Sequence, residues 1–360
     1  MLTIAAALFV LSLLIIFHEW GHFLVARLCG VQVHRFSVGF GPVLLCRRLG
    51  ETEFCLSTIP LGGYVKLLGE NPEEPLLPEE RPRAFSEKPL WQRTLIVAAG
   101  PLSNFLLAWL IFVVFFGLKG KPHVLPEVGQ VISGSPAEAA GLRPGDLILA
   151  VNGRRVRTWE ELTERVRREG LRPLILEVRR GKRTFKLRVV AQVREVHDLF
   201  GERKRVPVIG IVASGRVATE RLSPFRALWE AWVRVAELTR LTVVAIVKLL
   251  ERALPLSSLG GPLLIAQMAG EQARQGFLAL LLFSGILSVN LAVINLLPVP
   301  MLDGGHLVFY GVEALRGRPL SPRTQERIQK VGLALLIALM VLVFYNDLVR
   351  LFPRWRPGHP

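Results

Sequence analysis

Four long apolar segments constrain the fold of this 360-residue chain more than any other feature of its sequence. A helix needs about 20 predominantly apolar residues to cross the hydrocarbon core of a bilayer. The segments that meet this requirement are residues 1–28, 93–118, 277–302 and 331–351. They predict a polytopic α-helical membrane protein with four transmembrane helices.

A fifth apolar stretch, residues 224–254, differs from these four because it carries charged side chains at helical spacing. Such a helix is typical of the membrane interface or of packing against the protein itself. We therefore expect an amphipathic helix and a connecting segment over residues 224–272. The first apolar segment is expected to stay in the mature chain, because it has neither a basic start nor a small-residue cleavage site.

The composition excludes several classes of protein. With 51% hydrophobic and 21% charged residues, the chain is too apolar for an ordinary soluble protein and too charged for a wholly buried one. Its net charge of +16 comes without any recognisable nucleic-acid module, so a membrane surface is the better partner and nucleic acid is not expected. The cysteines are odd in number and form no C-x-x-C pair, so we expect reduced thiols at Cys29, Cys46 and Cys55.

The distribution of Lys and Arg predicts the orientation in the membrane. These residues gather in 29–92, between the first two apolar segments, and in 303–330, between the last two. Short loops enriched in Lys and Arg stay in the cytoplasm, whereas long domains cross largely regardless of their charge. Both loops are therefore predicted to be cytoplasmic, with the intervening region 119–275 on the other side.

That middle region contains a predicted soluble α/β domain at residues 124–193, followed by a linker at 194–223. Strand-like and helical patterns alternate in it, with a hairpin-type turn at Asn152-Gly153. The run SPAEAAGLRPGD, residues 135–146, resembles the PDZ family. This resemblance implies peptide binding by strand addition at a sheet edge. The alternative is a structural cap that binds no peptide.

The first apolar segment contains the motif H-E-x-x-H at His18, Glu19 and His22. Residues four apart share one face of a helix, so both imidazoles can bind one metal ion with Glu19 beside them. Pairs of histidines on a helix are also common as plain surface residues. However, an acid inside a bilayer helix needs a partner, and this location favours a Zn²⁺ site.

A catalytic zinc site needs three protein ligands and an open position. The third apolar segment ends in the sequence NLLPVPMLDGGH, where Pro298 and Pro300 must break the helix. Asp303 then follows on irregular backbone at membrane depth, which is tolerated only inside protein or beside a cavity. We predict Asp303 as the third ligand. The alternatives are a capping role for Asp303, or ligation by His306 or Cys29.

At these two motifs the chain resembles the site-2 protease family, in its bacterial single-PDZ form. The H-E-x-x-H motif matches the family's first motif, and the residues from Asn295 to Asp303 match N-x-x-P-x-P-x-L-D-G. The resemblance implies an intramembrane zinc metalloprotease of the bacterial inner membrane, with its active site toward the cytoplasm and its PDZ-like domain outside. Its implied substrates are transmembrane segments such as those of anti-sigma factors or signal peptide remnants, already cut by another protease.

The resemblance also implies roles for individual residues. Zinc would be held by the two histidines and Asp303, and Glu19 would be the general base. Contacts with the substrate are implied for Asn295, Pro298 and Pro300. A helix-packing asparagine and two kink prolines are the alternative interpretation.

The first cytoplasmic loop contains strand-like residues on both sides of Gly62 and Gly63. This stretch, 54–69, resembles the family's membrane-associated β-sheet. A protease must offer an unwound transmembrane helix other hydrogen-bond partners, and a sheet edge near Gly62 and Gly63 would do so by strand addition. A hairpin with only a packing role is the alternative.

Two other functional classes are compatible with parts of the sequence. One is a noncatalytic PDZ-bearing membrane scaffold or chaperone, and the other is a transporter with intramembrane ionisable residues and broken helices. Neither explains an acid placed between two metal ligands. A transporter would also be expected to have related halves, and we find no internal repeat.

Overall fold

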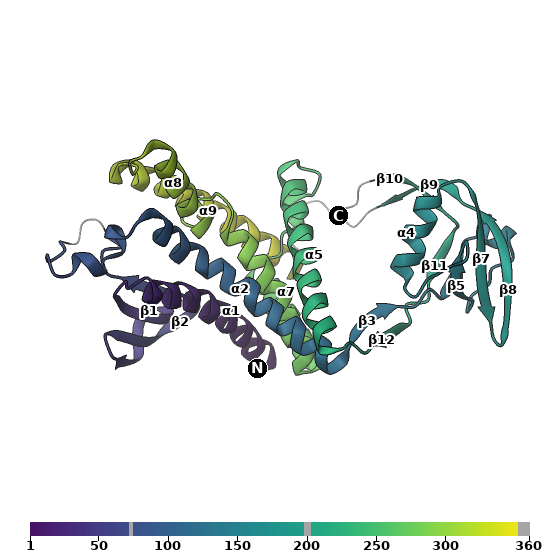
Figure 1. Ribbon diagram of the computed structural model, residues 1–360, viewed down its shortest axis with the longest axis horizontal. Coiled ribbons are helices and arrows are strands. Elements are labelled where there is room, and N and C mark those ends of the chain that lie inside the picture. The colour runs from purple at the N-terminus through teal and green to yellow at the C-terminus, as the bar shows by residue number, and fades with distance from the viewer. Residues whose placement is uncertain (72–74, 198–202, 352–360) are drawn as a thin grey trace. The chain divides into compact units, whose positions relative to one another are not determined.

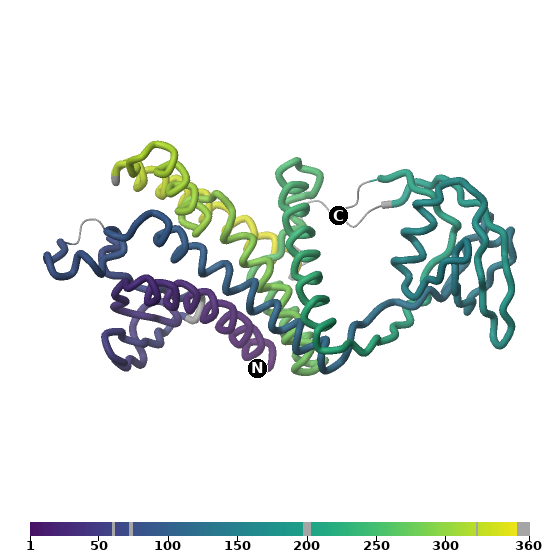
Figure 2. The backbone as a smooth tube through the Cα atoms, viewed as in Figure 1, coloured from purple at the N-terminus to yellow at the C-terminus, as the bar shows by residue number. Residues whose placement is uncertain are grey.

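The computed structural model describes residues 1–71, 75–197 and 203–351. It divides into two compact units (Figure 1). The first, which we call the membrane unit, comprises Met1–Phe115, Leu228–Leu249 and Pro255–Pro360. The second, which we call the PDZ-like unit, comprises Phe116–Ala227 and Leu250–Leu254. The chain passes from the first unit into the second at the end of helix α2 and returns through helix α5 (Figure 2).

Helices form most of the membrane unit. They are α1 (Leu2–Leu28), α2 (Leu90–Lys119), α5 (Pro224–Leu250), α6 (Pro262–Gln275), α7 (Phe277–Asn295), α8 (Asp303–Arg316) and α9 (Pro322–Leu351), with 3-10 turns at Arg81–Arg83, Phe85–Glu87 and Leu256–Ser258. Within the described residues, four helices are long and apolar enough to cross a membrane, namely α1, α2, α7 and α9. The predicted four-helix membrane architecture is confirmed.

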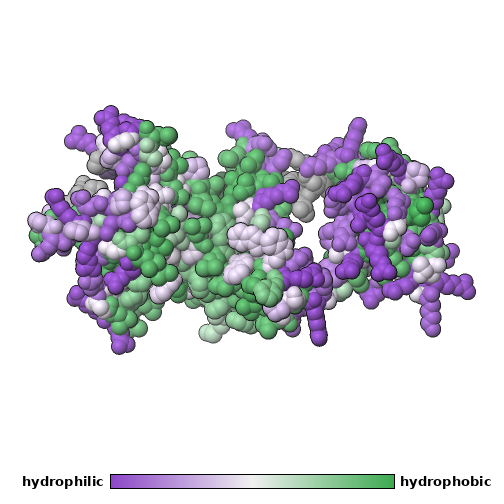
Figure 3. All heavy atoms as spheres, viewed as in Figure 1, coloured by the Kyte–Doolittle hydropathy of each residue, from purple (hydrophilic) through white to green (hydrophobic). Residues whose placement is uncertain are grey.

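The outer surface of these helices is apolar as well. On α9, for example, Val331, Leu335, Met340 and Val341 are all more than half exposed. Figure 3 shows a largely apolar surface over the helices of the membrane unit and a mostly hydrophilic surface over the PDZ-like unit. An apolar exterior of this extent suits lipid better than water.

The third apolar helix is shorter than the predicted 277–302, because α7 ends at Asn295. Pro298 and Pro300 lack the N–H that a helix requires, so the chain continues as a series of turns. The helix resumes as α8 at Asp303, inside the segment 303–330 that was expected to be a loop. The sequence-based prediction missed α8 because its apolar residues are too few for a membrane span.

Helix α5 packs against the protein instead of standing alone. Its Val235 and Leu238 are buried, and the Thr242 hydroxyl lies 2.7 Å from the Asn290 amide oxygen of α7. The Trp109 indole of α2 donates a hydrogen bond to the Leu228 carbonyl at 3.1 Å. These contacts agree with the predicted amphipathic helix and identify α2 and α7 as its supports.

Strands β1 (Val33–Leu49) and β2 (Thr52–Leu67) form a long, bent hairpin. Residues 33–38 pair on one side with 63–67, and residues 35–38 pair on the other side with 53–56. The outer side of 52–57 pairs with 43–49. Residues 63–67 therefore form one edge of the sheet. Large apolar side chains are exposed along the outer part of the hairpin. They include Phe40, Val43, Leu44, Leu45, Leu49, Leu56 and Ile59.

The PDZ-like unit is a small α/β domain with a continuous apolar core that includes Ile148, Leu162 and Leu176. Its four-stranded sheet has the order β6-β5-β7-β8, and β4 pairs with β11, β3 with β12, and β9 with β10. Its elements are β3 (Lys121–Val124), β4 (Val128–Val131), α3 (Pro136–Ala139), β5 (Leu147–Val151), β6 (Arg154–Arg155), α4 (Trp159–Glu169), β7 (Pro173–Arg180), β8 (Arg183–Val190), β9 (Gln192–His197), β10 (Arg203–Val208), β11 (Ile211–Ala213) and β12 (Val217–Glu220).

The prediction of a linker at 194–223 is wrong for its described residues. Strands β10, β11 and β12 all lie in it, and the last two pair with β4 and β3 near the start of the unit. Periodicity does not reveal this pairing, because it joins segments about eighty or more residues apart. Residues 198–202 of the predicted linker lie outside the described part of the chain.

A partly buried ion pair lies at the end of the PDZ-like sequence run. Asp146 is fully buried and accepts hydrogen bonds from Arg180 at 2.7 and 2.8 Å and from the Arg143 N–H at 2.9 Å. Burial acts to raise the pKa of Asp146, but these hydrogen bonds outweigh it and hold the pKa below its usual value. The Pro-Gly-Asp turn is therefore stabilised by charge as well as by backbone geometry.

Candidate active site

Two imidazoles of α1 and one carboxylate of α8 converge on a single point. His18 Nε2 lies 3.2 Å from Asp303 Oδ2, and His22 Nε2 lies 3.5 Å from Asp303 Oδ1. The two Nε2 atoms are 3.3 Å apart. The histidines meet because they are one helical turn apart, and Asp303 reaches them as the first residue of α8. The structure thus brings together the three residues that the sequence predicts as ligands.

This donor set fits a zinc ion. Zinc binds nitrogen at about 2.0–2.1 Å and carboxylate oxygen at about 2.0–2.2 Å with tetrahedral geometry, for which donor atoms lie roughly 3.3 Å apart. The three observed separations run from 3.2 to 3.5 Å. Two imidazole nitrogens and a carboxylate at these distances favour a shared cation.

The protonation of His22 is fixed by the backbone of α2. Its Nδ1 lies 2.9 Å from the Ile96 carbonyl oxygen. A carbonyl only accepts hydrogen bonds, so Nδ1 must carry the proton and Nε2 keeps its lone pair. His22 is therefore held in the tautomer that a metal needs.

Glycines bring α1 and α2 into close contact at the site. A methyl group at Gly100 would lie 2.2 Å from His22 Nε2 and 2.9 Å from His18 Cε1, and one at Gly21 would lie 2.3 Å from the Ala99 carbonyl oxygen. Small residues allow helix backbones to approach in this way. The two imidazoles therefore lie directly against the backbone of α2.

The start of α8 also depends on glycines. A methyl at Gly304 would lie 2.2 Å from the Leu297 carbonyl oxygen, and one at Gly305 would lie 2.4 Å from that of Val299. Only glycine permits this close approach between the helix and the turns before it. The two glycines after Asp303 thus fix where its carboxylate lies.

Glu19 lies beside the other three side chains and against the β1–β2 hairpin. It interacts electrostatically with His18 and Asp303. A methyl at Gly63 would lie 2.9 Å from Glu19 Cγ, so strand β2 passes directly over this side chain. Its neighbour Gly62 lies against the Phe40 ring of β1. The edge segment 63–67 therefore begins next to Glu19.

The other predicted substrate-binding residues lie on the turns between α7 and α8. Asn295 is the half-buried last residue of α7, and Pro298 is exposed. Pro300 packs against α9, where a methyl at Gly332 would lie 2.4 Å from Pro300 Cβ. Pro300 therefore has a structural contact whatever else it does.

Neither alternative ligand belongs to the group of His18, His22 and Asp303, whose donor atoms all lie within 4.8 Å of one another. His306 is one turn beyond Asp303, with its ring against Phe309 at 6.1 Å between centroids. Burial lowers the pKa of His306, and the Asp303 carboxylate opposes that shift. Cys29 follows the end of α1 as a free thiol. Asp303 is the candidate whose carboxylate lies within 3.5 Å of both His18 and His22.

Comparison with known proteins identifies the family. Residues 6–339 match Peptidase family M50. The chain belongs to peptidase family M50. It is 39% identical to a protein named as a zinc metalloprotease from Agrobacterium fabrum, over 94% of this chain and 93% of that one. It is 35% identical to Metalloprotease MmpA of Caulobacter vibrioides, over 97% and 96% of the two chains.

A further relative, Protease RseP of Yersinia pestis, is 32% identical over 97% of this chain and 99% of its own length. A solved PDZ domain of an SdrC-like protein from Listeria monocytogenes is 22% identical over 25% of this chain and 86% of that chain, with a TM-score of 0.20. The M50 chain described here is a multi-pass membrane protein and a zinc metalloprotease. The scaffold and transporter alternatives are not favoured.

Sequence reasoning missed the contribution of α2 to this site. Ile96, Gly100 and Asn104 are spaced four residues apart, which places them on one face of the helix, and all three touch the histidines. A glycine and an asparagine four residues apart in an apolar helix are the sequence signal that could have indicated this face. The sequence alone cannot tell which face of α2 meets α1.

A second missed contact anchors α8 to α2. Arg93 makes hydrogen bonds with both carboxylate oxygens of Glu313, at 2.5 and 3.2 Å, and both side chains are about 15% exposed. The guanidinium of Arg93 also lies 5.3 Å from the centre of the Tyr310 ring. Burial raises the pKa of Tyr310 to about 12, against the influence of Arg93. This pair fixes the helix that carries Asp303.

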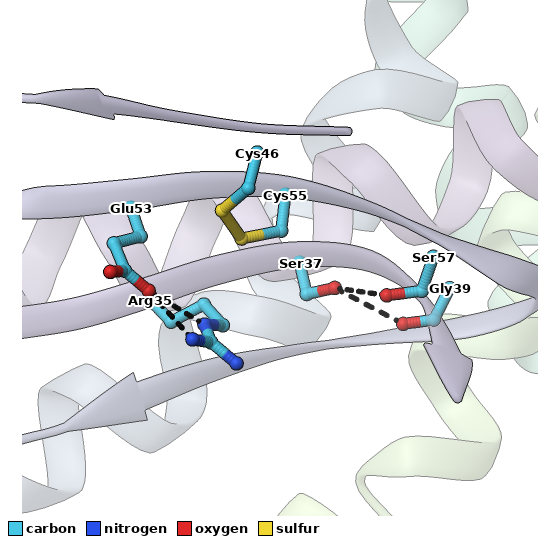
Figure 4. The surroundings of a disulfide bond; sticks show 7 residues. All are labelled: Arg35, Ser37, Gly39, Cys46, Glu53, Cys55 and Ser57. Carbon is cyan, nitrogen blue, oxygen red and sulfur yellow. Dashed lines mark hydrogen bonds and ion pairs between the residues drawn. A yellow bond between two sulfur atoms is a disulfide. The ribbon is translucent and has the colours of Figure 1, made fainter. Parts of the chain in front are cut away.

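The prediction of three reduced cysteines is wrong. Cys46 and Cys55 form a disulfide across the β1–β2 hairpin, close to the Arg35–Glu53 ion pair (Figure 4). The two cysteines are cross-strand partners, and neighbouring side chains on paired strands lie close together. An odd count and the absence of C-x-x-C could not reveal this, because the pairing depends on the register of the hairpin.

Proposed function

We propose that His18, His22 and Asp303 hold the zinc ion of this M50 metalloprotease and that Glu19 is its general base. The observation that supports the ligand set is the convergence of the two Nε2 atoms and the Asp303 carboxylate, at separations of 3.2–3.5 Å. A zinc ion held by these residues would lower the pKa of a bound water toward neutrality and would polarise the scissile carbonyl. Glu19 takes the proton of the attacking water and delivers it to the leaving amine.

The substrate must be extended before it can be cut. A transmembrane helix hides each carbonyl in its own hydrogen bonds, so other partners have to replace them. We assign this role to the edge segment 63–67, which begins beside Glu19. An extended substrate that pairs with this edge has its backbone close to the general base.

We assign the path of the extended substrate to the space beside this edge and call it the substrate passage. Gly62 and Gly63 line it, and a side chain at either position would meet Phe40 or Glu19. Asn295 and Pro298 are assigned to the opposite wall of the passage, on the turns that lead to Asp303. Pro300 shapes the same turns through its contact with α9. The exposed apolar residues of the hairpin hold the sheet in the membrane interface.

The membrane side follows from the Lys and Arg distribution. Loops 29–92 and 303–330 are assigned to the cytoplasm of a bacterial inner membrane, and the PDZ-like unit to the other side. The substrates are membrane proteins with a transmembrane segment, such as anti-sigma factors or signal peptide remnants, already shortened by another protease. The PDZ-like unit then acts as a size filter that excludes substrates with bulky outer domains from the zinc site.

Two substitutions test the assignment of ligands and base. Glu19→Gln keeps a polar side chain of the same size and should retain zinc while cleavage of a model transmembrane peptide falls roughly 10²–10⁴-fold. Asp303→Ala should bind zinc more weakly and lose cleavage. Glu271→Gln, the same change at an exposed position in α6, is the control and should behave as wild type. Full cleavage by Glu19→Gln, or full zinc occupancy in Asp303→Ala, would overturn the respective role.

A further inference from the structure

The side chain of Asn104 lies buried beside the first zinc ligand. Asn104 is fully buried in α2, and its amide nitrogen lies 3.3 Å from His18 Nδ1. Its amide oxygen is buried and, among the described residues, has no hydrogen-bond partner. The Ser288 hydroxyl donates to the Asn104 carbonyl at 2.7 Å, which fixes the backbone at this point. Of the two polar groups of this buried amide, the nitrogen contacts His18 and the oxygen has no partner among the described residues.

The chemistry of His18 explains what Asn104 can do. His18 Nε2 lies 3.2 Å from Asp303 and 3.3 Å from His22, so it must present a lone pair to bind the shared cation. A neutral imidazole carries one proton, which then resides on Nδ1 and makes this atom a donor. A donor facing the amide NH₂ is mismatched. With the amide turned about its terminal bond, the oxygen faces Nδ1 and can accept its proton.

We propose that the Asn104 amide oxygen accepts the Nδ1–H of His18 and holds this histidine in the tautomer that binds zinc. Asn104 is thus a positioning residue, and the inference rests on the proposed ligation by His18. It parallels the role of the Ile96 carbonyl toward His22. One face of α2 then orients both imidazoles, with Gly100 between the two acceptors giving room for the rings. Acceptors of this kind set the tautomer and basicity of metal-bound histidines.

Substitutions at Asn104 distinguish a side chain that accepts a hydrogen bond from one that only fills space. Asn104→Leu keeps the volume and removes the acceptor, so its zinc affinity should fall roughly 10–100-fold. Asn104→Asp retains an acceptor oxygen without requiring an amide donor, so zinc affinity should stay within a few fold of wild type. Ser103→Ala is the matched control, because it removes a hydroxyl from the same contact of α2 with α1 without touching an imidazole.

The measurement is competition with a chelator for zinc in the purified full-length protein in detergent. The visible spectrum of the cobalt-substituted protein reports the ligand geometry independently of cleavage. Wild-type affinity and spectrum in Asn104→Leu would overturn the proposal, and so would loss of zinc in Asn104→Asp. If Asn104→Leu does not fold, Asn104→Asp alone decides between these outcomes. His18→Ala tests the ligand assignment separately from the role of Asn104, since unchanged zinc affinity in that variant would overturn the ligand set itself.

Discussion

Substitution of Gly100 by alanine should displace the metal-binding imidazoles. The added methyl would lie 2.2 Å from His22 Nε2 and 2.5 Å from His22 Cε1, whereas ordinary contacts begin at 3.4 Å. The ring must therefore move by about 1.2 Å, or α1 and α2 must separate by a similar amount. The methyl would also lie 2.9 Å from His18 Cε1 and would displace that ring by a smaller amount.

The expected effect of Gly100→Ala on catalysis is large. Misplacement of a catalytic group by about 1 Å can lower the rate about 10²-fold, and here the displaced group is a proposed metal ligand. Zinc affinity should fall as well, because the 3.3–3.5 Å separations from Nε2 of His22 to the other donor atoms can no longer be kept. Helix propensity acts in the opposite direction, since alanine is better than glycine in a helix by about 1 kcal/mol.

The assay for Gly100→Ala combines zinc content, cleavage of a model transmembrane peptide and thermal unfolding in detergent. Gly117→Ala is the matched control in the same helix, because a methyl there meets nothing within 4 Å. It should gain helix propensity and keep zinc and activity. If Gly100→Ala also kept wild-type zinc affinity and cleavage, the close packing of α2 on the imidazoles would be refuted as a determinant of the site.

Three further predictions concern other parts of the chain. Arg93→Leu leaves the Glu313 carboxylate without its partner, and breaking a buried pair can cost about 3–5 kcal/mol. The variant should therefore unfold at a lower temperature and cleave more slowly, and unchanged stability would refute the anchoring of α8. Maleimide should label one thiol per unreduced, denatured chain and three after reduction, and three labels before reduction would exclude the Cys46–Cys55 disulfide. Residues 121–220 can be deleted as a unit because their end strands pair Lys121 with Glu220. The deletion should allow cleavage of a bulky substrate, while a trimmed substrate is cut at a rate similar to wild type. Loss of trimmed-substrate cleavage in a folded, zinc-loaded protein would indicate that the PDZ-like unit recruits substrates instead of filtering them.

The parts of the fold that could be predicted from the sequence are those set by local chemistry. The membrane helices follow from the length of apolar runs, and the end of α7 follows from Pro298 and Pro300. The two histidines share a face because a helix repeats every 3.6 residues. Asp303 could be proposed as a ligand for a related reason, since it comes directly after an interruption that backbone chemistry makes necessary.

The parts that could not be predicted depend on contacts between distant segments. Arg93 and Glu313 are 220 residues apart, and nothing local marks either as the other's partner. Asp347 of α9 is another case, because its buried carboxylate accepts hydrogen bonds from the N–H groups of Gly261 and Leu263 at the start of α6. An isolated acid in an apolar helix signals a partner but does not name it.

The turns between α7 and α8 show how an active site can be built at membrane depth. Every backbone N–H that is buried there needs an acceptor, because lipid offers none. Two of these positions are prolines, which have no N–H to satisfy. The N–H groups of Leu297, Val299 and Leu302 donate within the turns, to the Ile294, Leu297 and Val299 carbonyls at 3.0, 2.7 and 3.1 Å. The prolines therefore do more than end a helix: they reduce the number of donors that an irregular segment must satisfy, and this lets the chain present Asp303 to the two histidines from a position where an ordinary loop would be unstable.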